Sequence, residues 1–248
     1  MPATKQRIDQ AFTFHLPEPG PSLRAIPYGV APSKEFVRVL SKPQRLALAG
    51  IATRERLPSR AIVYRGDTPA EHVFIIERGV VKSFRDLPSG KRRVAAFWYP
   101  EDIFGLAEAG RYVNTLQTVT PAVIYRLQLD GLMELLKRDP ALDLQLLCKL
   151  AHEIRVAYKH TILVARRDAP GRMVMFLRTL LEQQREAKSD VIDIPMTRSD
   201  IASYLGISLE AVVRACHKLK KAGVVDFVGL HTARILNQAQ FDKMAASL

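Results

Sequence analysis

Apolar positions near the C-terminal end of the chain follow the period of two short helices. Ile201 and Leu205 lie on one face of the first helix, expected over about residues 198–204, and Gly206 can adopt the positive φ of a tight turn. The second helix is expected to follow Ser208 as its N-cap and to run to about Lys221. Its apolar face comprises Val212, Ala215, Cys216 and Leu219. Two short helices joined by a glycine-containing turn predict a helix-turn-helix.

The flanking residues extend this motif on both sides. Thr197 is a good N-cap for the first helix, and Asp200 three residues later gives a near capping box. Residues 224–228 and 232–235 flank Gly229-Leu230-His231 and have the composition of strands, which predicts a two-stranded wing.

The second helix carries a polar face beside its apolar one, and this face suits the major groove of DNA. Arginine can bind guanine O6 and N7 with two hydrogen bonds, and glutamate can accept one from a cytosine amino group. We therefore expect bases to be read by Glu210, Val213 and Arg214. Contacts with phosphates or the groove are expected from Thr197, Arg198, Ser208, His217, Lys218 and Lys221. The alternative is a helical hairpin on an enzyme, with a face that is merely solvated.

A long helix is predicted to start at Asp139 as N-cap and Pro140 as first helical residue. Its apolar stripe advances by 3, 4, 3, 4 and 3 residues, which favours a partner helix and hence a homodimer. The stripe comprises Leu147, Leu150, Ile154, Ala157, Thr161 and Val164. Packing within a single chain would explain the same stripe. Residues 168–171 are expected to end the helix as a hinge, and another helix is expected from Met173 to Gln183.

Residues 60–129 change character, because short runs rich in Val, Ile, Phe and Tyr alternate with glycine-containing turns. This pattern predicts a β-sandwich or jelly roll. Residues 34–57 have helical spacing, and residues 1–33 are proline-rich without a sustained period. We expect an α+β chain with a flexible extension (1–33), a β-roll with flanking helices (34–138), a dimerisation helix (139–168) and a winged helix-turn-helix (169–248).

The charge and the cysteine content limit which binding partners and which cellular compartment we expect. The net charge of +12 favours a polyanion such as double-stranded DNA, but residues 170–248 hold 11 Lys and Arg against 8 Asp and Glu, a net charge of only +3. Cys148 and Cys216 cannot build a disulfide framework and fit a reducing cytoplasm. No apolar run approaches 18 residues, so we expect no membrane association.

The run MTRSDIASYLG, followed by Glu210 and Arg214, resembles the C-terminal signature of the CRP/FNR superfamily of bacterial transcription regulators, nearest to its FNR and FixK-like branches. The resemblance implies a dimer on a pseudo-palindromic operator, with Glu210 and Arg214 as base readers and activation through RNA polymerase. The loop from Asp86 to Arg93 is a candidate polymerase surface. Val213 stands where the family usually has serine, so the operator sequence does not carry over. An apolar Val213 can contact a thymine methyl group.

The resemblance extends to the family's cyclic-nucleotide-binding type of β-roll, at Gly66-Asp67, Gly79 and residues 102–105. A nucleotide phosphate needs an arginine and backbone N–H groups, and Glu108 and Arg111 are present without the later Arg-Ser pair of nucleotide-binding members. Two cysteines do not supply the thiolates of an iron–sulfur cluster. We therefore expect no cofactor and no metal, with a small ligand or haem in the β-roll as the alternative.

Cys216, inside the predicted reading helix, has two interpretations. A free cysteine is commonly a small buried apolar residue. Alternatively, its oxidation would add bulk and charge near DNA, as in FixK-like regulators that resemble this chain in carrying a redox-sensitive cysteine near their reading helix. An enzyme is not favoured, because the sequence has no glycine-rich phosphate loop, nucleophile elbow or metal-spaced His/Glu set.

Overall fold

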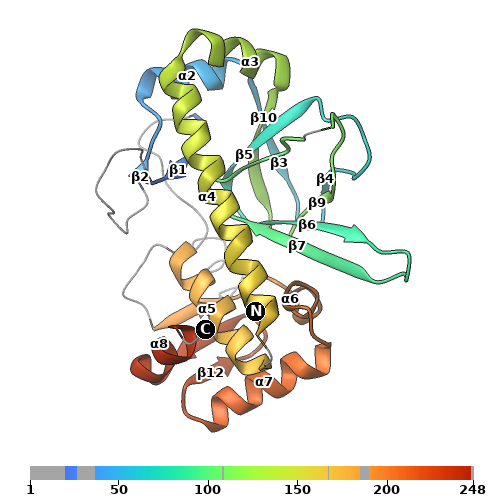
Figure 1. Cartoon of the computed structure of the whole chain (residues 1–248), viewed down its shortest axis with the longest axis vertical. Helices are drawn as coiled ribbons and strands as arrows, with labels where there is room; N and C mark the ends of the chain where they lie inside the picture. The colour runs from blue at the N-terminus through green and yellow to red at the C-terminus, as the bar shows by residue number, and fades with distance from the viewer. Residues whose placement is uncertain (1–19, 27–36, 108, 167, 185–189, 247–248) are drawn as a thin grey trace. The chain divides into compact units, whose positions relative to one another are not determined.

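The computed structural model describes residues 20–26, 37–107, 109–166, 168–184 and 190–246. They fall into two compact units. The β-roll unit comprises the described residues between 13 and 85 together with residues 97–157, and the C-terminal unit comprises residues 86–96 and the described residues from 158 on. The elements of each unit are labelled in Figure 1.

Two four-stranded antiparallel sheets form the β-roll, which confirms the predicted jelly-roll type of fold. The first sheet has the order β3-β10-β5-β8, with strands Ala52–Leu57, Ala122–Gln128, His72–Arg78 and Ile103–Phe104. The second has the order β4-β9-β6-β7, with strands Ile62–Tyr64, Thr115–Thr118, Val81–Asp86 and Arg92–Trp98. Residues 92–96 of β7 thus belong to this sheet, although residues 86–96 are grouped with the C-terminal unit.

Both faces of β5 are buried at its centre, which explains the unbroken apolar run VFII from Val73 to Ile76. Phe74 and Ile76 point into the roll, where they pack with Phe104, Leu116 and Ile124. Val73 and Ile75 face the opposite side, where Leu48, Leu127 and Leu132 form a second core. Gly79 turns the chain between β5 and β6 with φ +87°, and a Cβ there would lie 2.4 Å from the Pro121 carbonyl oxygen.

Helices α2 (Lys42–Gly50) and α3 (Leu129–Arg138) supply residues of the second core. Residues 52–57 lie in β3 instead of continuing the helical pattern expected over 34–57, because they pair with β10 along their length. Part of the predicted N-terminal extension is described: β1 (Arg24–Ala25) pairs with β2 (Val37–Arg38), and Leu23 is buried in the second core. Residues 1–19 and 27–33 of that extension lie outside the described residues.

Helix α4 runs from Pro140 to Ala165. Asp139 accepts hydrogen bonds from the N–H groups of Ala141 and Leu142, each at 3.0 Å, as expected of the predicted N-cap. On the side facing the β-roll, α4 buries Leu142 and Leu146 in the second core.

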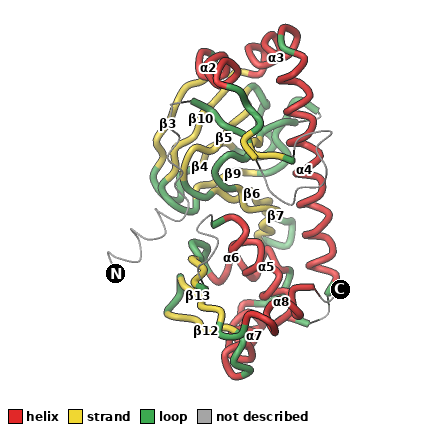
Figure 2. Tube along the Cα trace, turned by 90° about the vertical axis from the view of Figure 1, so that its left-hand side faces the viewer, coloured by secondary structure: helices red, strands yellow, loops and turns green. Residues whose placement is uncertain are grey.

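The C-terminal unit contains the predicted helix-turn-helix and wing (Figure 2). Its helices are α5 (Ala169–Gln183), α6 (Arg198–Leu205), α7 (Leu209–Lys221) and α8 (Gln238–Ala246). Its strands β11 (Val191–Asp193), β13 (Thr232–Ile235) and β12 (Val225–Val228) form one sheet in that order.

Helix α5 begins four residues earlier than predicted, in the segment expected to be a hinge loop. The Asp168 carboxylate accepts a hydrogen bond from the Gly171 N–H at 2.6 Å, which makes Asp168 an N-cap. Pro170 lies in the first turn, where a helix needs no N–H donor. The proline and glycine therefore belong to the start of this helix and not to a hinge loop.

Candidate nucleic-acid interface

The turn between α6 and α7 has the geometry that the sequence predicts. Thr197 caps α6 by accepting a hydrogen bond from the Asp200 N–H at 3.1 Å, and its hydroxyl donates to the Asp200 carboxylate at 2.9 Å. Gly206 has φ +68° and ψ +33°, which is the left-handed conformation. Ser208 caps α7 by accepting a hydrogen bond from the Ala211 N–H at 3.1 Å.

Helix α7 is divided into a buried face and an exposed face. Val212, Ala215 and Leu219 are at most 1% exposed and anchor the helix in the C-terminal unit. The residues that we expected to touch DNA from this helix are all exposed, namely Glu210, Val213, Arg214, His217, Lys218 and Lys221. The side proposed to read bases is therefore uncovered by the described part of the chain.

Positive charge in the C-terminal half of α7 favours contact with an anionic partner such as DNA. The last turn carries Lys218, Lys220 and Lys221, of which Lys220 forms an ion pair with Asp226 at 2.8 Å. Glu210 lies in the first turn, where its own backbone N–H and the Ser208 hydroxyl lower the pKa of its carboxyl group. Glu210 is consequently a carboxylate at neutral pH, which can accept but not donate hydrogen bonds.

Val213 is an apolar side chain on this polar face, with 44% of its surface exposed. It lies beside Arg214 and one helical turn from Glu210, so these three side chains form one outward patch. We name Glu210, Val213 and Arg214 the reading patch. The patch offers a carboxylate, a branched apolar group and a guanidinium, which are three groups able to distinguish base edges.

The structure gives Arg198 a role in holding the wing. Its side chain is half-buried, and its guanidinium lies 5.4 Å from the centre of the Phe227 ring on β12. In the turn between β12 and β13, His231 Nδ1 lies 3.0 Å from the Ile194 carbonyl oxygen, which also holds the wing. At the wing tip Val228 and Leu230 are exposed.

Cys216 is half-buried at the border of the two faces of α7. Burial raises the pKa of its thiol, against the opposing effect of the nearby Arg198 charge. A raised pKa keeps the thiol protonated at neutral pH, whereas the thiolate is the form that oxidants attack.

The predicted dimer seam on α4 is only partly outward. Leu147, Ile154, Ala157 and Thr161 are exposed, whereas Leu150 and Val164 are half-buried. The exposed apolar stripe continues through three further residues that the spacing did not select, namely Leu144, Ala151 and Tyr158. Together with Leu147, Ile154 and Thr161, these positions advance by 3, 4, 3, 4 and 3 residues, so the outward stripe is shifted around the helix from the predicted one.

Lys149, also on α4, belongs to a charged cluster that the sequence did not predict. Its side chain is 1% exposed, and its Nζ lies 2.7 Å from both Asp102 Oδ1 and Glu153 Oε1. A lysine and a glutamate four residues apart normally indicate a surface pair. The fold adds Asp102, from the turn before β8, and buries the cluster.

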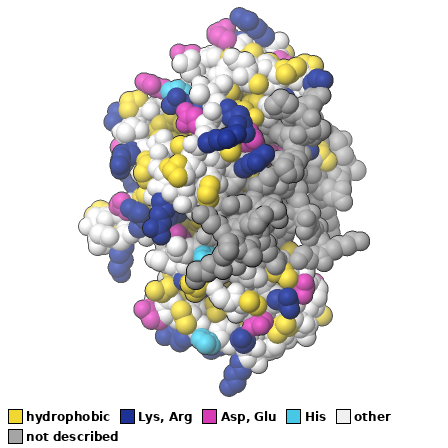
Figure 3. Space-filling view, turned by 180° about the vertical axis from the view of Figure 1, so that it is seen from behind, with side chains coloured by type: hydrophobic (Ala, Val, Ile, Leu, Met, Phe, Trp, Pro, Cys, Tyr) yellow, Lys and Arg dark blue, Asp and Glu magenta, His cyan; other side chains and the backbone are white. Residues whose placement is uncertain are grey.

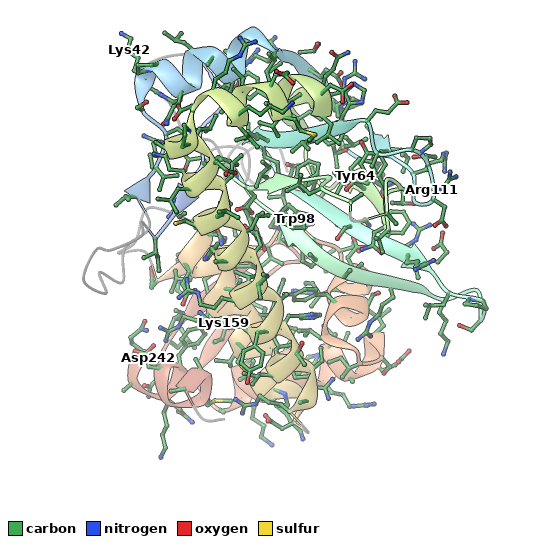
Figure 4. All side chains as sticks on the ribbon, turned by 45° about the horizontal axis from the view of Figure 1, so that its top comes forward. Lys42, Tyr64, Trp98, Arg111, Lys159 and Asp242 are labelled. Atoms are coloured by element: carbon green, nitrogen blue, oxygen red, sulfur yellow. The ribbon has the colours of Figure 1, made fainter. Side chains whose placement is uncertain are left out.

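Aromatic side chains fill the interior of the β-roll. Tyr64 and Tyr112 stack with ring centres 3.8 Å apart, and Phe74 and Phe104 stack at 5.4 Å. Trp98 lies 5.9 Å from Phe104. Figure 4 labels Tyr64 and Trp98 among these side chains and Arg111 at the margin of the roll.

Arg111, one of the two residues considered for a phosphate, is exposed and donates a hydrogen bond to the Asp67 carbonyl oxygen. Glu108, the other, lies outside the described residues. Within the described residues, no three or more His, Cys, Asp and Glu side chains gather as metal ligands would. Among the same residues no helix is both long and apolar enough to cross a bilayer.

Basic side chains are not confined to the C-terminal unit. On the face drawn in Figure 3, Lys and Arg side chains gather over the β-roll unit as well as over the C-terminal unit. Positive charge alone therefore does not locate a DNA site, and the reading patch must be identified by its side chains.

Comparison with known proteins identifies both parts of the chain. A model of the cyclic nucleotide-binding domain matches residues 54–139, and a model of the Crp-like helix-turn-helix domain matches residues 171–244. The transcriptional activatory protein AadR of Rhodopseudomonas palustris is 24% identical over 79% of this chain and 83% of its own length. The nitrogen fixation regulation protein FixK of Rhizobium meliloti is 28% identical over 72% of this chain and 80% of its own.

Among solved structures, FixK2 from Bradyrhizobium japonicum aligns with a TM-score of 0.73 and 28% identity, over 80% of this chain and 99% of the FixK2 chain. This match confirms the predicted fold class of a β-roll, a long helix and a helix-turn-helix. The chain belongs to the CRP/FNR family and is a DNA-binding transcription regulator.

Proposed function

We propose that the chain acts as a homodimer that reads a pseudo-palindromic DNA operator and activates transcription through RNA polymerase. The observation that supports base reading most directly is the exposed reading patch on a helix whose opposite face is buried. In a two-fold dimer each protomer presents this patch to one of two major grooves about 34–36 Å apart. A protein that reads the chromosome works in the same compartment, which for a bacterial regulator is the cytoplasm.

The outward stripe of α4 supports self-association. Leu147, Ile154 and Tyr158 are 56%, 71% and 66% exposed, which is costly for large apolar side chains on one helix face. A second copy of α4 would bury the stripe by knobs-into-holes packing. The proposed seam therefore comprises Leu144, Leu147, Ala151, Ile154, Tyr158 and Thr161, with Leu150, Ala157 and Val164 along its edge.

Activation is supported by the name of AadR, a transcriptional activatory protein. Contact with RNA polymerase requires a surface that remains exposed beside bound DNA. The loop from Asp86 to Arg93 remains our candidate, since most of its side chains are exposed and Arg92 forms an ion pair with Asp86 at 2.8 Å.

The test of base reading is selection of bound DNA from a random pool by purified protein under reducing conditions without an added effector. We expect a two-fold symmetric motif with half-sites one helical turn apart. Transcription from a template with that motif upstream of a weak promoter should then rise when the protein is added to RNA polymerase. A bound pool without a shared motif contradicts effector-independent reading and favours a regulator that needs a ligand or haem.

The test of the dimer is sedimentation of Ile154→Glu. A charge in the centre of the seam should cost at least about 2 kcal/mol of association free energy, because an ion loses its water there without a partner. Lys159→Glu, on the same helix and away from the seam, is the control and should sediment as the native chain does. Equal sedimentation of both variants with the native chain contradicts the proposed seam.

A further inference from the structure

The C-terminal end of α6 is capped by side chains from two other helices. The last carbonyl groups of a helix have no partner within it and need donors from elsewhere. Here the Tyr204 carbonyl oxygen lies 2.9 Å from His160 Nε2, and the Leu205 carbonyl oxygen accepts a hydrogen bond from Arg172 Nη1 at 2.7 Å. The same nitrogen lies 3.4 Å from the Gly206 carbonyl oxygen. The three carbonyl groups that lead into the turn are thus held in sequence.

His160 reaches this end from the last two turns of α4. Its ring stacks on the Tyr204 ring with centres 4.1 Å apart and an interplanar angle of 19°. Tyr204 also packs against Phe176 of α5 at 5.8 Å. A carbonyl oxygen can accept but not donate a hydrogen bond, so the contact with His160 requires a proton on Nε2. The stacking and the hydrogen bond together fix the histidine against α6.

Arg172 joins α6 to the end of α4. While Nη1 binds the Leu205 carbonyl oxygen, Nε donates to the Arg166 carbonyl oxygen at 2.8 Å. Arg166 is itself fixed, because its side chain donates to the Met244 carbonyl oxygen and to the Asp168 carboxylate, each at 3.1 Å. The planar guanidinium thus spans two points of the chain at fixed separation, which a lysine ammonium cannot do.

We propose that His160 and Arg172 are positioning residues that fix the α6–α7 turn against the end of α4 and thereby set the direction of the reading patch. The inference rests on the proposed function that this patch reads bases. Neither residue belongs to the patch, and both belong to helices outside the helix-turn-helix. Loss of either should loosen the turn and reduce sequence selectivity more than it reduces non-specific attraction to DNA.

The first measurement needs no DNA: amide hydrogen exchange at Gly206 and Ile207, whose N–H groups donate to the Ala202 carbonyl oxygen. Arg172→Ala and Arg172→Lys should both speed this exchange about tenfold, because one lost charge-assisted hydrogen bond is of that order. His160→Phe, which keeps a ring on Tyr204 but removes the donor, should speed it less, and His160→Gln, which keeps a donor, least.

Arg178→Ala is the matched control for these variants. Arg178 lies on the same helix as Arg172 and binds Asp242 of α8, so its removal also deletes an ion pair without touching the turn. Exchange at Gly206 and Ile207 should then stay at the native rate. Equal acceleration in Arg178→Ala would mean a general loss of stability and would overturn the positioning role.

The second measurement compares affinity for a selected operator with affinity for random DNA at several salt concentrations. Arg172→Ala should lower the ratio about tenfold and leave the salt slope unchanged, since no phosphate contact is lost. Native protein that binds both DNAs alike contradicts the proposed function. Native selectivity that survives in both Arg172→Ala and His160→Phe overturns only the positioning role.

Discussion

The interior of the β-roll and the outer face of α7 use their side chains in opposite ways. In the roll, Phe74 and Phe104 are 3% and 4% exposed and stack on each other, so their apolar surface is buried within the unit. On α7, Glu210 and Arg214 are exposed with charged groups directed away from the core. The packed side chains of the roll stabilise the fold, whereas the exposed side chains of α7 remain able to bind DNA.

This contrast separates residues by what their replacement should change. A side chain in the roll should affect the free energy of unfolding and leave DNA affinity unchanged. A side chain of the reading patch should affect DNA affinity and leave the free energy of unfolding nearly unchanged.

The largest effect is expected from Phe104→Ala. Phe104 packs against Phe74, Tyr64 and Trp98, with ring centres 5.4–6.3 Å away. Truncation leaves a cavity that the surrounding aromatic rings cannot fill, so the free energy of unfolding should fall by about 3–5 kcal/mol. Urea unfolding measures this change. Operator affinity, measured where the variant is still folded, should equal that of the native chain.

Val213→Ala is the reciprocal variant, because Val213 is also apolar but exposed. Its free energy of unfolding should remain within about 0.5 kcal/mol of the native value. Its DNA preference should change at the position that the lost methyl groups contact. If Phe104→Ala alters base preference, or Val213→Ala costs as much stability as Phe104→Ala, the separation between the two regions is wrong.

Arg214→Ala should cost about 1–3 kcal/mol of DNA-binding free energy per half-site and relax the choice of base. The guanidinium is exposed, so its loss should barely change the free energy of unfolding. Titration of operator and of variants with single base changes measures both effects.

Lys218→Ala is the comparison for that titration. Lys218 is exposed on the last turn of α7, where we expect a phosphate contact. Its removal should weaken operator and random DNA alike and reduce the salt slope by about one unit. Unchanged affinities of Arg214→Ala for both DNAs would remove Arg214 from the reading patch.

The sequence predicted α6, α7, their caps and the wing well, because these depend on local chemistry. Thr197, Gly206 and Ser208 each act through atoms within a few residues, so their spacing suffices. The α5 start was wrong because Pro170 and Gly171 are typical of both hinges and first helical turns. Only the cap formed by Asp168 distinguishes them.

The contacts that the sequence did not predict join residues far apart in the chain. Asp102 is 47 residues from Lys149, and His160 is 44 residues from Tyr204. No periodicity encodes such pairs, since each member has an ordinary local interpretation: a loop acid, a surface lysine, a helical histidine. The shift of the outward stripe on α4 has the same origin. Packing of the β-roll decides which side of a largely apolar helix is covered.

Glu153 is a buried acidic residue, so the free energy of unfolding should depend on whether its carboxyl group is protonated. Burial raises the pKa of Glu153 to about 7, and Asp102 adds to the rise against the opposing Lys149 charge. In the unfolded chain the pKa of a glutamate is about 4.3, so at pH values between about 4.3 and about 7 the folded chain binds more protons than the unfolded chain. The free energy of unfolding should therefore fall as pH rises from about 4.5 to about 7.

Glu153→Gln should lack this loss, because glutamine stays neutral. Urea unfolding at several pH values should show the variant gaining on the native chain as pH rises through that range. Glu134→Gln is the control, since Glu134 is exposed beside Lys137, which lowers the pKa of its carboxyl group. Parallel pH profiles of Glu153→Gln and the native chain would contradict the raised pKa.

The smallest effect is expected at Cys216, which lies between the buried and the exposed face of α7. Because burial raises its thiol pKa, only a minor fraction is thiolate at neutral pH, and a thiol reagent should modify it more slowly than a free cysteine. The rate, measured in a Cys148→Ser background so that one thiol reacts, should increase about tenfold per pH unit below the pKa.

If Cys216 controls DNA binding by oxidation, operator affinity should fall in step with this modification, and Cys216→Ser should retain full affinity under the same oxidant. Equal oxidant sensitivity of Cys216→Ser and the native chain would leave Cys216 a packing residue, on the same side of the comparison as Phe104.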